Sequence, residues 1–213
     1  MTKKRQIVFD TETTGLSPKF GHRVVDLGAV ELIDGKRTGR TLQFYLNPRR
    51  DSDPKAFEVH GLTREFLSDK PDFSQIADEF IQFVSGAEVI AHNAKFDVSF
   101  LDAELESCHK EPLWKHVEKI TDTVAMARTI IKGSVSLDVL CERYGIVVDR
   151  EKHGALLDSE ILVDVLGKLI EEADNGKVTA DEPKIEWTAK TKVVYATDSD
   201  KDEHLRILKS IRE

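Results

Sequence analysis

The sequence predicts an α/β domain in which helices cover a mixed β-sheet. Three runs rich in β-branched and aromatic residues follow one another near the N-terminus, and helical patterns then alternate with shorter apolar runs. Three strands in succession favour an antiparallel meander. The full order, βββ-α-β-α-β-α-α, therefore indicates a mixed sheet flanked by helices.

Five strands are expected, at residues 5–12, 23–33, 41–47, 88–91 and 118–123. The first strand ends at a Thr-Thr-Gly boundary, where β-branched residues give way to a turn. Asp34 and Gly35 form a turn signal between the second and third strands. These three strands are therefore expected to pair in order.

Helices are expected from residue 74, from residue 93, over residues 136–144 and over residues 154–173. In the first, apolar residues recur at spacings of three and four, as at Phe80, Ile81 and Val84. Asn93 and Ser136 are the expected N-caps of the second and third helices, because their side chains can accept hydrogen bonds from first-turn N–H groups.

Length and composition indicate one ordinary globular domain with a tail. The chain has 213 residues, of which 40% are hydrophobic and 33% charged. No apolar run approaches the roughly 20 residues that span a bilayer, and Asp10 breaks the first apolar run too early for a signal peptide. Cys108 and Cys141 have neither metal-ligand spacing nor a disulfide framework, so a cytoplasmic location is expected.

The composition shifts after residue 173, which divides the chain into three parts. Residues 1–173 contain the strongly periodic elements and form the expected folded domain. Residues 174–191 are polar and aperiodic, as in a linker. In residues 192–213 a strand-like run precedes a short expected helix with Asp198 as its cap.

The formal net charge of −8 limits the kinds of partner. Binding long duplex DNA through a broad surface needs many Lys/Arg–phosphate contacts, which this composition disfavours. A protein that grips a few nucleotides at a strand end is not excluded, because bound cations can offset an acidic site.

Asp10 and Glu12 form the first acidic cluster. Side chains alternate along a strand, so residues two apart project from the same face, here at the strand end before a glycine. Neighbouring carboxylates repel unless a cation lies between them, and oxygen-rich pairs suit Mg²⁺ or Mn²⁺. Acid-x-acid triplets also arise by chance, as at Asp51 and Asp53, so a solvated strand end is the alternative interpretation.

Asp97 belongs to the second cluster, HNAKFD at residues 92–97. The cluster lies at a strand-to-helix junction, where functional groups of open α/β sheets gather. Taken by itself, a carboxylate in the first turn of a helix is explained equally well as a complement to the helix dipole.

His153 and Asp158 belong to the third cluster, HGALLD at residues 153–158. Asp158 falls in the first turns of a helix whose apolar set includes Ile161 and Val165, and an acid there is costly to bury unless it is paired or metal-bound. A loop histidine is usually an exposed bystander. Its unperturbed pKa of roughly 6.5 nevertheless suits a general base at neutral pH.

Together and in this order, the three clusters resemble the motifs of the DEDDh exonuclease superfamily, also called DnaQ-like. The resemblance covers residues 5–170, through FDTETTG, HNAKFD and HGALLD and the intervening DPKAFEVHGLT and SLDVLCERYGI. It is strongest to the members that proofread for bacterial replicative DNA polymerases. It implies a ribonuclease H-like exonuclease fold and metal-dependent 3′→5′ hydrolysis of single-stranded or mispaired DNA ends to 5′-mononucleotides, in the bacterial cytoplasm.

The resemblance also implies roles for the five clustered residues. Asp10, Glu12 and Asp158 would be direct ligands of two divalent cations, Mg²⁺ or Mn²⁺, with Asp10 bridging both. Asp97 would act through a metal-bound water, and His153 would be the general base. The chemistry needs such a site, because a phosphodiester repels hydroxide and free water has a pKa near 15.7.

Contacts with the terminal nucleotide are implied for the ligands Asp10, Glu12 and Asp158 and for Thr13, Gly15, Leu16, Lys55 and His60. Leu16 follows the acidic pair in a turn, where it could wedge against a base. Lys55 departs from the family pattern, which has an acid at this position. A lysine there would instead meet a phosphate.

The tail carries the expected partner contacts. Residues 191–198 and the helix after them resemble the segment that docks a proofreading subunit onto the polymerase α subunit, and a linker with a small anchor raises effective concentration. An ordinary disordered tail is the alternative. Residues 170–190 show no glutamine-led clamp-binding motif, so contact with the sliding clamp is not expected. A θ-like accessory subunit is a further partner found in some bacteria.

Two other functions stay open. A free-standing exonuclease of the same superfamily could act on RNA or oligonucleotide ends, since the carboxylates do not distinguish a 2′-hydroxyl. A catalytically inactive subunit could serve the polymerase structurally. Five acid and histidine groups in family order argue against that reading.

Overall fold

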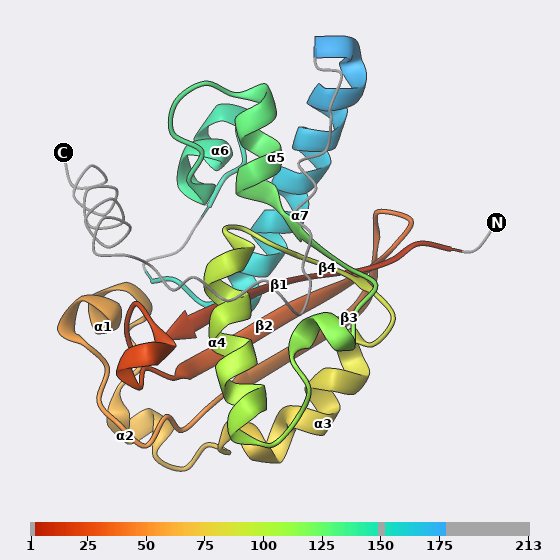
Figure 1. Cartoon of the computed structure of the whole chain (residues 1–213). Coiled ribbons are helices and arrows are strands. Elements are labelled where there is room, and N and C mark those ends of the chain that lie inside the picture. Colours follow the sequence, from red (N-terminus) through yellow and green to blue (C-terminus); the bar gives the residue numbers. More distant parts are fainter. Residues whose placement is uncertain (1–2, 149–151, 178–213) are drawn as a thin grey trace.

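A computed structural model of the chain describes residues 3–148 and 152–177 and contains one five-stranded sheet (Figure 1). Its strands are β1 (Arg5–Thr13), β2 (Val24–Ile33), β3 (Lys36–Tyr45), β4 (Glu88–Ala91) and β5 (Lys119–Asp122). The order across the sheet is β3-β2-β1-β4-β5. β1, β2 and β3 pair antiparallel, whereas β4 pairs parallel with β1 and β5. The predicted mixed sheet and N-terminal meander are thus confirmed.

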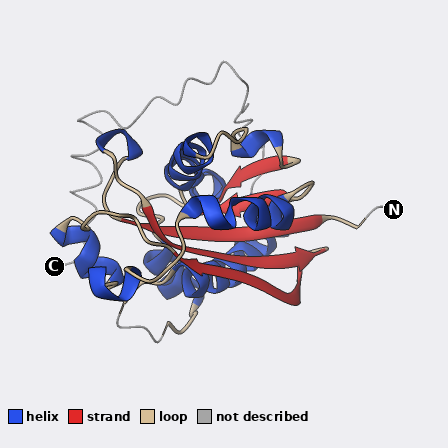
Figure 2. Ribbon diagram, turned by 90° about the horizontal axis from the view of Figure 1, so that it is seen from below, coloured by secondary structure: helices blue, strands red, loops and turns tan. Residues whose placement is uncertain are grey.

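Helices lie on both faces of this sheet (Figure 2). The α-helices are α1 (Pro54–His60), α2 (Arg64–Leu67), α3 (Phe73–Val84), α4 (Ala94–Ser107), α5 (Thr123–Ile130), α6 (Leu137–Tyr144) and α7 (Ala155–Glu172). Short 3-10 turns occupy Pro18–Phe20 and Leu113–Lys115, and a π-helical turn at Ala173–Lys177 follows α7.

Alternation along β1 decides which side chains meet which helices. Ile7 and Phe9 belong to the core cluster that α3 and α4 build on one face. Val8 points to the other face and packs with residues of α7. Because side chains alternate, Asp10 and Glu12 follow Val8 onto the α7 face, and Thr11 follows Phe9 onto the α4 face.

Three helices and part of a strand lie outside the sequence prediction. β3 begins at Lys36 rather than residue 41, and its first residues are exposed, so backbone pairing with β2 rather than an apolar pattern defines them. The helices α1 and α2 have seven and four residues. Segments this short show too little periodicity to be recognised in a sequence. α5 has eight residues, the same number as the predicted α6, but follows β5 directly, with Asp122 as both the last strand residue and the N-cap.

The expected caps have different outcomes. Ser136 accepts a hydrogen bond from the Val139 N–H, as predicted. Asn93 precedes α4 in a left-handed conformation, with φ of 70°, and its side chain makes no capping hydrogen bond. Its own N–H instead donates to Asp122 Oδ1 at 3.1 Å, which ties the end of β4 to the end of β5.

The linker after residue 177 and the expected tail elements at residues 192–213 lie outside the described residues. Within the described part of the chain, no helix combines the length and apolarity that crossing a bilayer would need.

Candidate active site

The three motif clusters converge at one edge of the sheet. β1 and β4 are parallel, so their carboxyl ends meet there. α4 begins directly after β4, and α7 lies against β1 and β2 on the opposite face. The acids of β1 are therefore approached by the first turn of α4 from one face and the first turn of α7 from the other.

Glu12, His153 and Asp158 form a compact cluster of possible ligands. One ligand atom from each lies within 4.8 Å of the others. Glu12 is 9% exposed and Asp158 is 3% exposed, whereas Asp10 is half-buried on the same face of β1 as Glu12. The solvated strand end considered for the first cluster does not describe Glu12, because its carboxylate is buried beside another acid.

Asp97 reaches β1 from the α4 face. Its Oδ1 accepts hydrogen bonds from the Thr11 N–H at 3.1 Å and the Thr11 hydroxyl at 2.7 Å. Thr11 lies between Asp10 and Glu12, so this contact fixes Asp97 beside the acidic pair. Burial raises the pKa of the Asp97 carboxyl, and the hydrogen bonds from Thr11 oppose that shift. A role confined to the helix dipole does not account for this placement.

His153 is held between α1 and α7. Its Nδ1 lies 3.1 Å from Asp158 Oδ2, and its backbone N–H donates to the Val59 carbonyl at 3.2 Å. The Gly154 N–H donates to the same Asp158 oxygen at 3.3 Å. The His153 side chain remains 41% exposed, so the ring joins the acidic cluster while staying accessible to water.

The residues implied to contact substrate lie at the end of β1, in the turn after it and on α1. Thr13 donates from its hydroxyl to the Gly15 carbonyl at 2.7 Å, which stiffens the turn after β1. Leu16 is partly exposed in that turn, and Lys55 is exposed on α1. The contact of Lys55 with a phosphate stays a prediction.

His60 ends α1 next to Val59 and is 4% exposed. Its Nδ1 accepts a hydrogen bond from the Leu62 N–H at 2.9 Å, so its Nε2 carries the proton. Among the described residues, Nε2 has no hydrogen-bond partner. Burial, followed by the nearby Lys152, lowers the pKa of His60 to about 4, so the ring is neutral at physiological pH.

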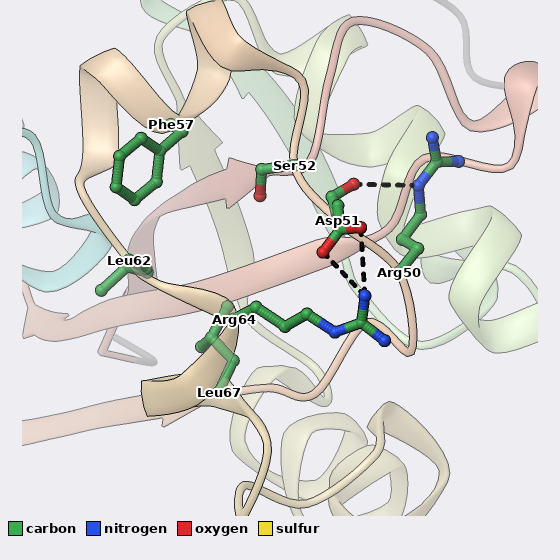
Figure 3. A pocket seen from close by; sticks show the side chains of 7 residues that line it. All are labelled: Arg50, Asp51, Ser52, Phe57, Leu62, Arg64 and Leu67. Carbon is green, nitrogen blue, oxygen red and sulfur yellow. Dashed lines mark hydrogen bonds and ion pairs between the residues drawn. The ribbon is translucent and has the colours of Figure 1, made fainter.

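A separate pocket of about 140 Å³ lies beside α1 (Figure 3). It is lined by Arg50, Asp51, Ser52, Phe57, Leu62, Arg64 and Leu67. Arg64 forms an ion pair with Asp51 across it at 2.9 Å. None of the clustered acids lines this pocket, so the chemistry indicated by the motifs lies elsewhere.

A buried acid on β2 is absent from the site residues predicted from the sequence. Asp26 is 1% exposed, and its Oδ2 accepts a hydrogen bond from the Ala155 N–H at 3.0 Å. Burial raises its pKa to about 6. The one available signal was an acid inside the apolar run RVVDLGAV, which is unusual for a strand with both faces covered.

Asp26→Asn is expected to change how stability depends on pH. Because the pKa of Asp26 is raised in the folded state, its contribution to the free energy of unfolding is fully present below pH 3.8, the ordinary pKa of the group. This contribution is lost as the pH rises through about 6. Relative to the Asn variant, the wild type should lose roughly 2–3 kcal/mol between about pH 4 and pH 8. Urea unfolding of both proteins in EDTA measures the difference. A difference that is constant with pH would contradict the raised pKa.

Comparison with known protein families and sequences agrees with the motif assignment. The Exonuclease (RNase T) family profile matches residues 7–166. The DNA polymerase III subunit epsilon of Escherichia coli K12 is 46% identical over 170 residues, covering 76% of this chain and 69% of its own. The epsilon subunit of Rickettsia conorii is 43% identical over 173 residues, which cover 80% of this chain and 75% of the relative. The epsilon subunit of Haemophilus influenzae is 38% identical over 235 residues, which cover 98% of this chain and 91% of the relative.

Solved structures share the fold. Exonuclease X in complex with 5′ overhanging duplex DNA superimposes with a TM-score of 0.60 at 25% identity, over 83% of this chain and 94% of its own. The nuclease domain of 3′hExo, described as a DEDDh family member bound to rAMP, gives a TM-score of 0.65 at 16% identity, over 82% and 94%. The second likeness concerns the fold alone.

Proposed function

The chain belongs to the exonuclease family, and on that premise we propose that it is the 3′→5′ proofreading exonuclease of a bacterial DNA polymerase III. The observation that carries the proposal is the cluster of Glu12, His153 and Asp158 within 4.8 Å at the edge of the sheet. Relatives named as the epsilon subunit of this polymerase, at 38–46% identity, support the assignment. The predicted family and exonuclease activity are confirmed.

The donor set fits divalent cations. Glu12 and Asp158 are buried close together, and two buried carboxylates at one site need a compensating positive charge. Carboxylate oxygens are the ligands that Mg²⁺ and Mn²⁺ prefer. Asp10, Glu12 and Asp158 would hold two such ions directly, and Asp97 would contribute through a water. When bound, the ions would lower the pKa of water and offset phosphate charge.

His153 supplies the general base. Its Nδ1 faces Asp158 Oδ2 at 3.1 Å, so Nδ1 carries the proton and Nε2 is the accepting nitrogen of the neutral ring. This arrangement matches a base that removes a proton from an attacking water, with the carboxylate fixing the tautomer and orientation of the ring. The backbone contact with Val59 holds the ring's loop in place.

The terminal nucleotide would lie between α1 and the turn after β1. The buried Nε2–H of His60 is a donor that a sugar or phosphate oxygen would satisfy. Thr13, Gly15 and Leu16 would form the opposite wall, and Lys55 would meet a phosphate from the exposed side of α1. Asp10, Glu12 and Asp158 would contact the scissile phosphate through the cations.

Hydrolysis of a 3′-mispaired primer tests the proposal. The full chain with Mg²⁺ or Mn²⁺ is expected to release 5′-mononucleotides from the mispaired DNA end faster than from an RNA oligomer of the same sequence. EDTA should abolish the release. Faster digestion of RNA would favour a free-standing RNA exonuclease, and no metal-dependent digestion of either would favour an inactive structural subunit.

The tail is proposed to anchor the chain to the polymerase. Residues 1–173 would be the exonuclease domain, residues 174–191 a linker, and residues 192–213 the contact with the α subunit. The alignment with the Haemophilus influenzae epsilon subunit covers 98% of this chain and so extends into residues 192–213. This supports a tail that the two proteins have in common. Neither a sliding-clamp contact nor a θ-like subunit is part of the proposal.

Deletion of the tail after Asn175 is expected to abolish capture of the polymerase α subunit in a pull-down with the purified proteins. Exonuclease activity on a single-stranded oligonucleotide should stay unchanged, because the acidic cluster lies before the deletion. Equal capture by the full and truncated chains would contradict the anchor and leave the exonuclease assignment standing.

A further inference from the structure

We propose that Asp26 is a positioning residue for the active site. Its hydrogen bond to the Ala155 N–H, together with a close backbone contact at Gly28 and the hydroxyl of Ser159, holds the first turn of α7 on the sheet. That turn carries Asp158, and His153 directly precedes it. The inference rests on the proposed exonuclease function and adds residues outside the five motif positions.

The register of β1 and β2 places Asp26 and Gly28 beside the proposed ligands. In the antiparallel ladder, Glu12 is paired with Asp26 and Asp10 with Gly28. Directly opposed residues project from the same face of a sheet. Asp26 and Gly28 therefore lie on the α7 face, each next to one acid of the first motif.

Asp26 acts as a cap supplied from the sheet. The first N–H groups of a helix have no partner within the helix. Gly154 is the N-cap of α7 and has no side chain, so no local group satisfies the Ala155 N–H. Asp26 Oδ2 accepts it at 3.0 Å, and Gln43 Nε2 lies 3.3 Å from Asp26 Oδ1. A carboxylate at this helix end also complements the helix dipole.

Gly28 allows the helix to approach this closely. A Cβ atom at Gly28 would lie 2.1 Å from the Leu156 nitrogen and 2.3 Å from the Ala155 carbonyl carbon, so the backbone of α7 occupies the space of a side chain. The Ser159 hydroxyl oxygen lies 2.7 Å from the Ala155 carbonyl oxygen and 3.1 Å from the Gly28 carbonyl oxygen, so its single proton is shared between α7 and β2 and fixes their approach.

The geometry of Asp158 depends on this attachment. The Asp158 N–H donates to the Gly154 carbonyl at 2.8 Å, so the carboxylate moves with the first turn. The buried apolar side chains of α7 that pack with Val8 and β2 on this face are Leu162, Val163 and Leu166, at least one turn later. A displacement of about 1 Å in a catalytic group can cost about 100-fold in rate.

Binding of Mn²⁺ to the full chain, followed by electron paramagnetic resonance without substrate, tests the role directly. Asp26→Ala is expected to raise the Mn²⁺ dissociation constant about tenfold and to lower kcat on a single-stranded oligonucleotide about 100-fold, with little change in KM. Asp26→Asn keeps an oxygen that can accept from Ala155. It should stay within about threefold of the wild type in both measurements.

Asp102→Ala is the matched control. Asp102 also has a pKa raised by burial and also accepts a backbone hydrogen bond, from the Leu113 N–H at 2.8 Å, but it lies on α4 away from the acidic cluster. Its variant should be destabilised without a change in Mn²⁺ affinity. If Asp26→Ala does not fold, Ser159→Ala decides, with a severalfold weaker Mn²⁺ affinity supporting the role and an unchanged affinity overturning it.

Three results would overturn the proposal: wild-type Mn²⁺ affinity in Asp26→Ala, equal losses in the Ala and Asn variants, or a comparable loss in Asp102→Ala. Equal losses would mean that the charge of Asp26, rather than its hydrogen bond to α7, matters. A wild-type chain that binds Mn²⁺ but releases no nucleotides would contradict the proposed function only, because the metal affinities are measured without substrate.

Discussion

Asp158→Ala is expected to lower nucleotide release by about 10³-fold or more while leaving the fold intact. Loss of a proposed direct metal ligand is expected to remove several kcal/mol of stabilisation of the reacting phosphate, and each 1.4 kcal/mol is about tenfold in rate. Asp158 also orients the His153 ring through the 3.1 Å contact, so one substitution removes two functions. Asp10→Ala should have an effect of similar size, because Asp10 is another of the residues proposed to hold the cations directly.

Thermal unfolding separates this effect from a loss of structure. Asp158 is 3% exposed, and removing a buried carboxylate also removes its desolvation cost, so the Tm in EDTA should not fall appreciably. The rise in Tm that Mg²⁺ or Mn²⁺ gives the wild type should be reduced in the variant, because a ligand that binds only the folded state stabilises it by mass action.

Asp164→Ala provides the control on the same helix. Asp164 is an acid with a half-exposed side chain that pairs with Arg37 at 2.8 Å, away from the acidic cluster. Surface ion pairs of this kind contribute little, so rate and metal response should match the wild type. Metal-dependent digestion of single-stranded DNA by Asp158→Ala at near wild-type rate would contradict the ligand assignment.

Gly28→Ala is expected to lower the free energy of unfolding by about 3 kcal/mol or more. The added Cβ would meet the backbone of Ala155 and Leu156 at 2.1–2.3 Å, and backbone atoms cannot rotate aside as a flexible side chain can. Overpacking a well-filled core costs about 1–3 kcal/mol even where side chains give way. If the helix moves outward to relieve the contact, Asp158 moves with it, so kcat should fall as well.

Gly167→Ala is the matched control for this substitution, and the opposite sign is expected. Gly167 is exposed within α7, and nothing lies within 4 Å of the Cβ it would gain. Replacing a helical glycine with alanine stabilises by roughly 0.5–1 kcal/mol. Urea unfolding of both variants provides the measurement. Wild-type stability in Gly28→Ala would contradict the close contact between α7 and β2.

The longer elements could be predicted because each carries its own periodic signal. Side chains alternate along β1, so Asp10 and Glu12 lie on the same face as Val8. Val8 packs with residues of α7, which places both acids on the α7 face. The helix after Ser136 was predicted with its cap. α1 and α2 escaped prediction because they have seven and four residues, too few for a periodic pattern.

Asn93 shows the limit of cap prediction. Asparagine is favoured both at N-caps and in the left-handed region, and the sequence does not distinguish these two preferences. The fold selects the second, because the left-handed conformation places the Asn93 N–H against Asp122 on the neighbouring strand. A contact between two strand ends decides the backbone conformation here.

The sequence by itself determined the fold class, the proposed ligands and the order in which they occur. Residue type and local spacing suffice for the fold class, since strand alternation and helix periodicity are short-range properties. The proposed ligands were identified by the order of the three motifs and its resemblance to the exonuclease superfamily, because each motif taken alone has an ordinary structural explanation. Only the tertiary structure decided how the acids meet. Asp97 bonds to Thr11 across 86 residues of sequence, and Asp26 to Ala155 across 129. Such contacts depend on how closely two packed elements approach, and in β2 that distance is set by the missing side chain of Gly28.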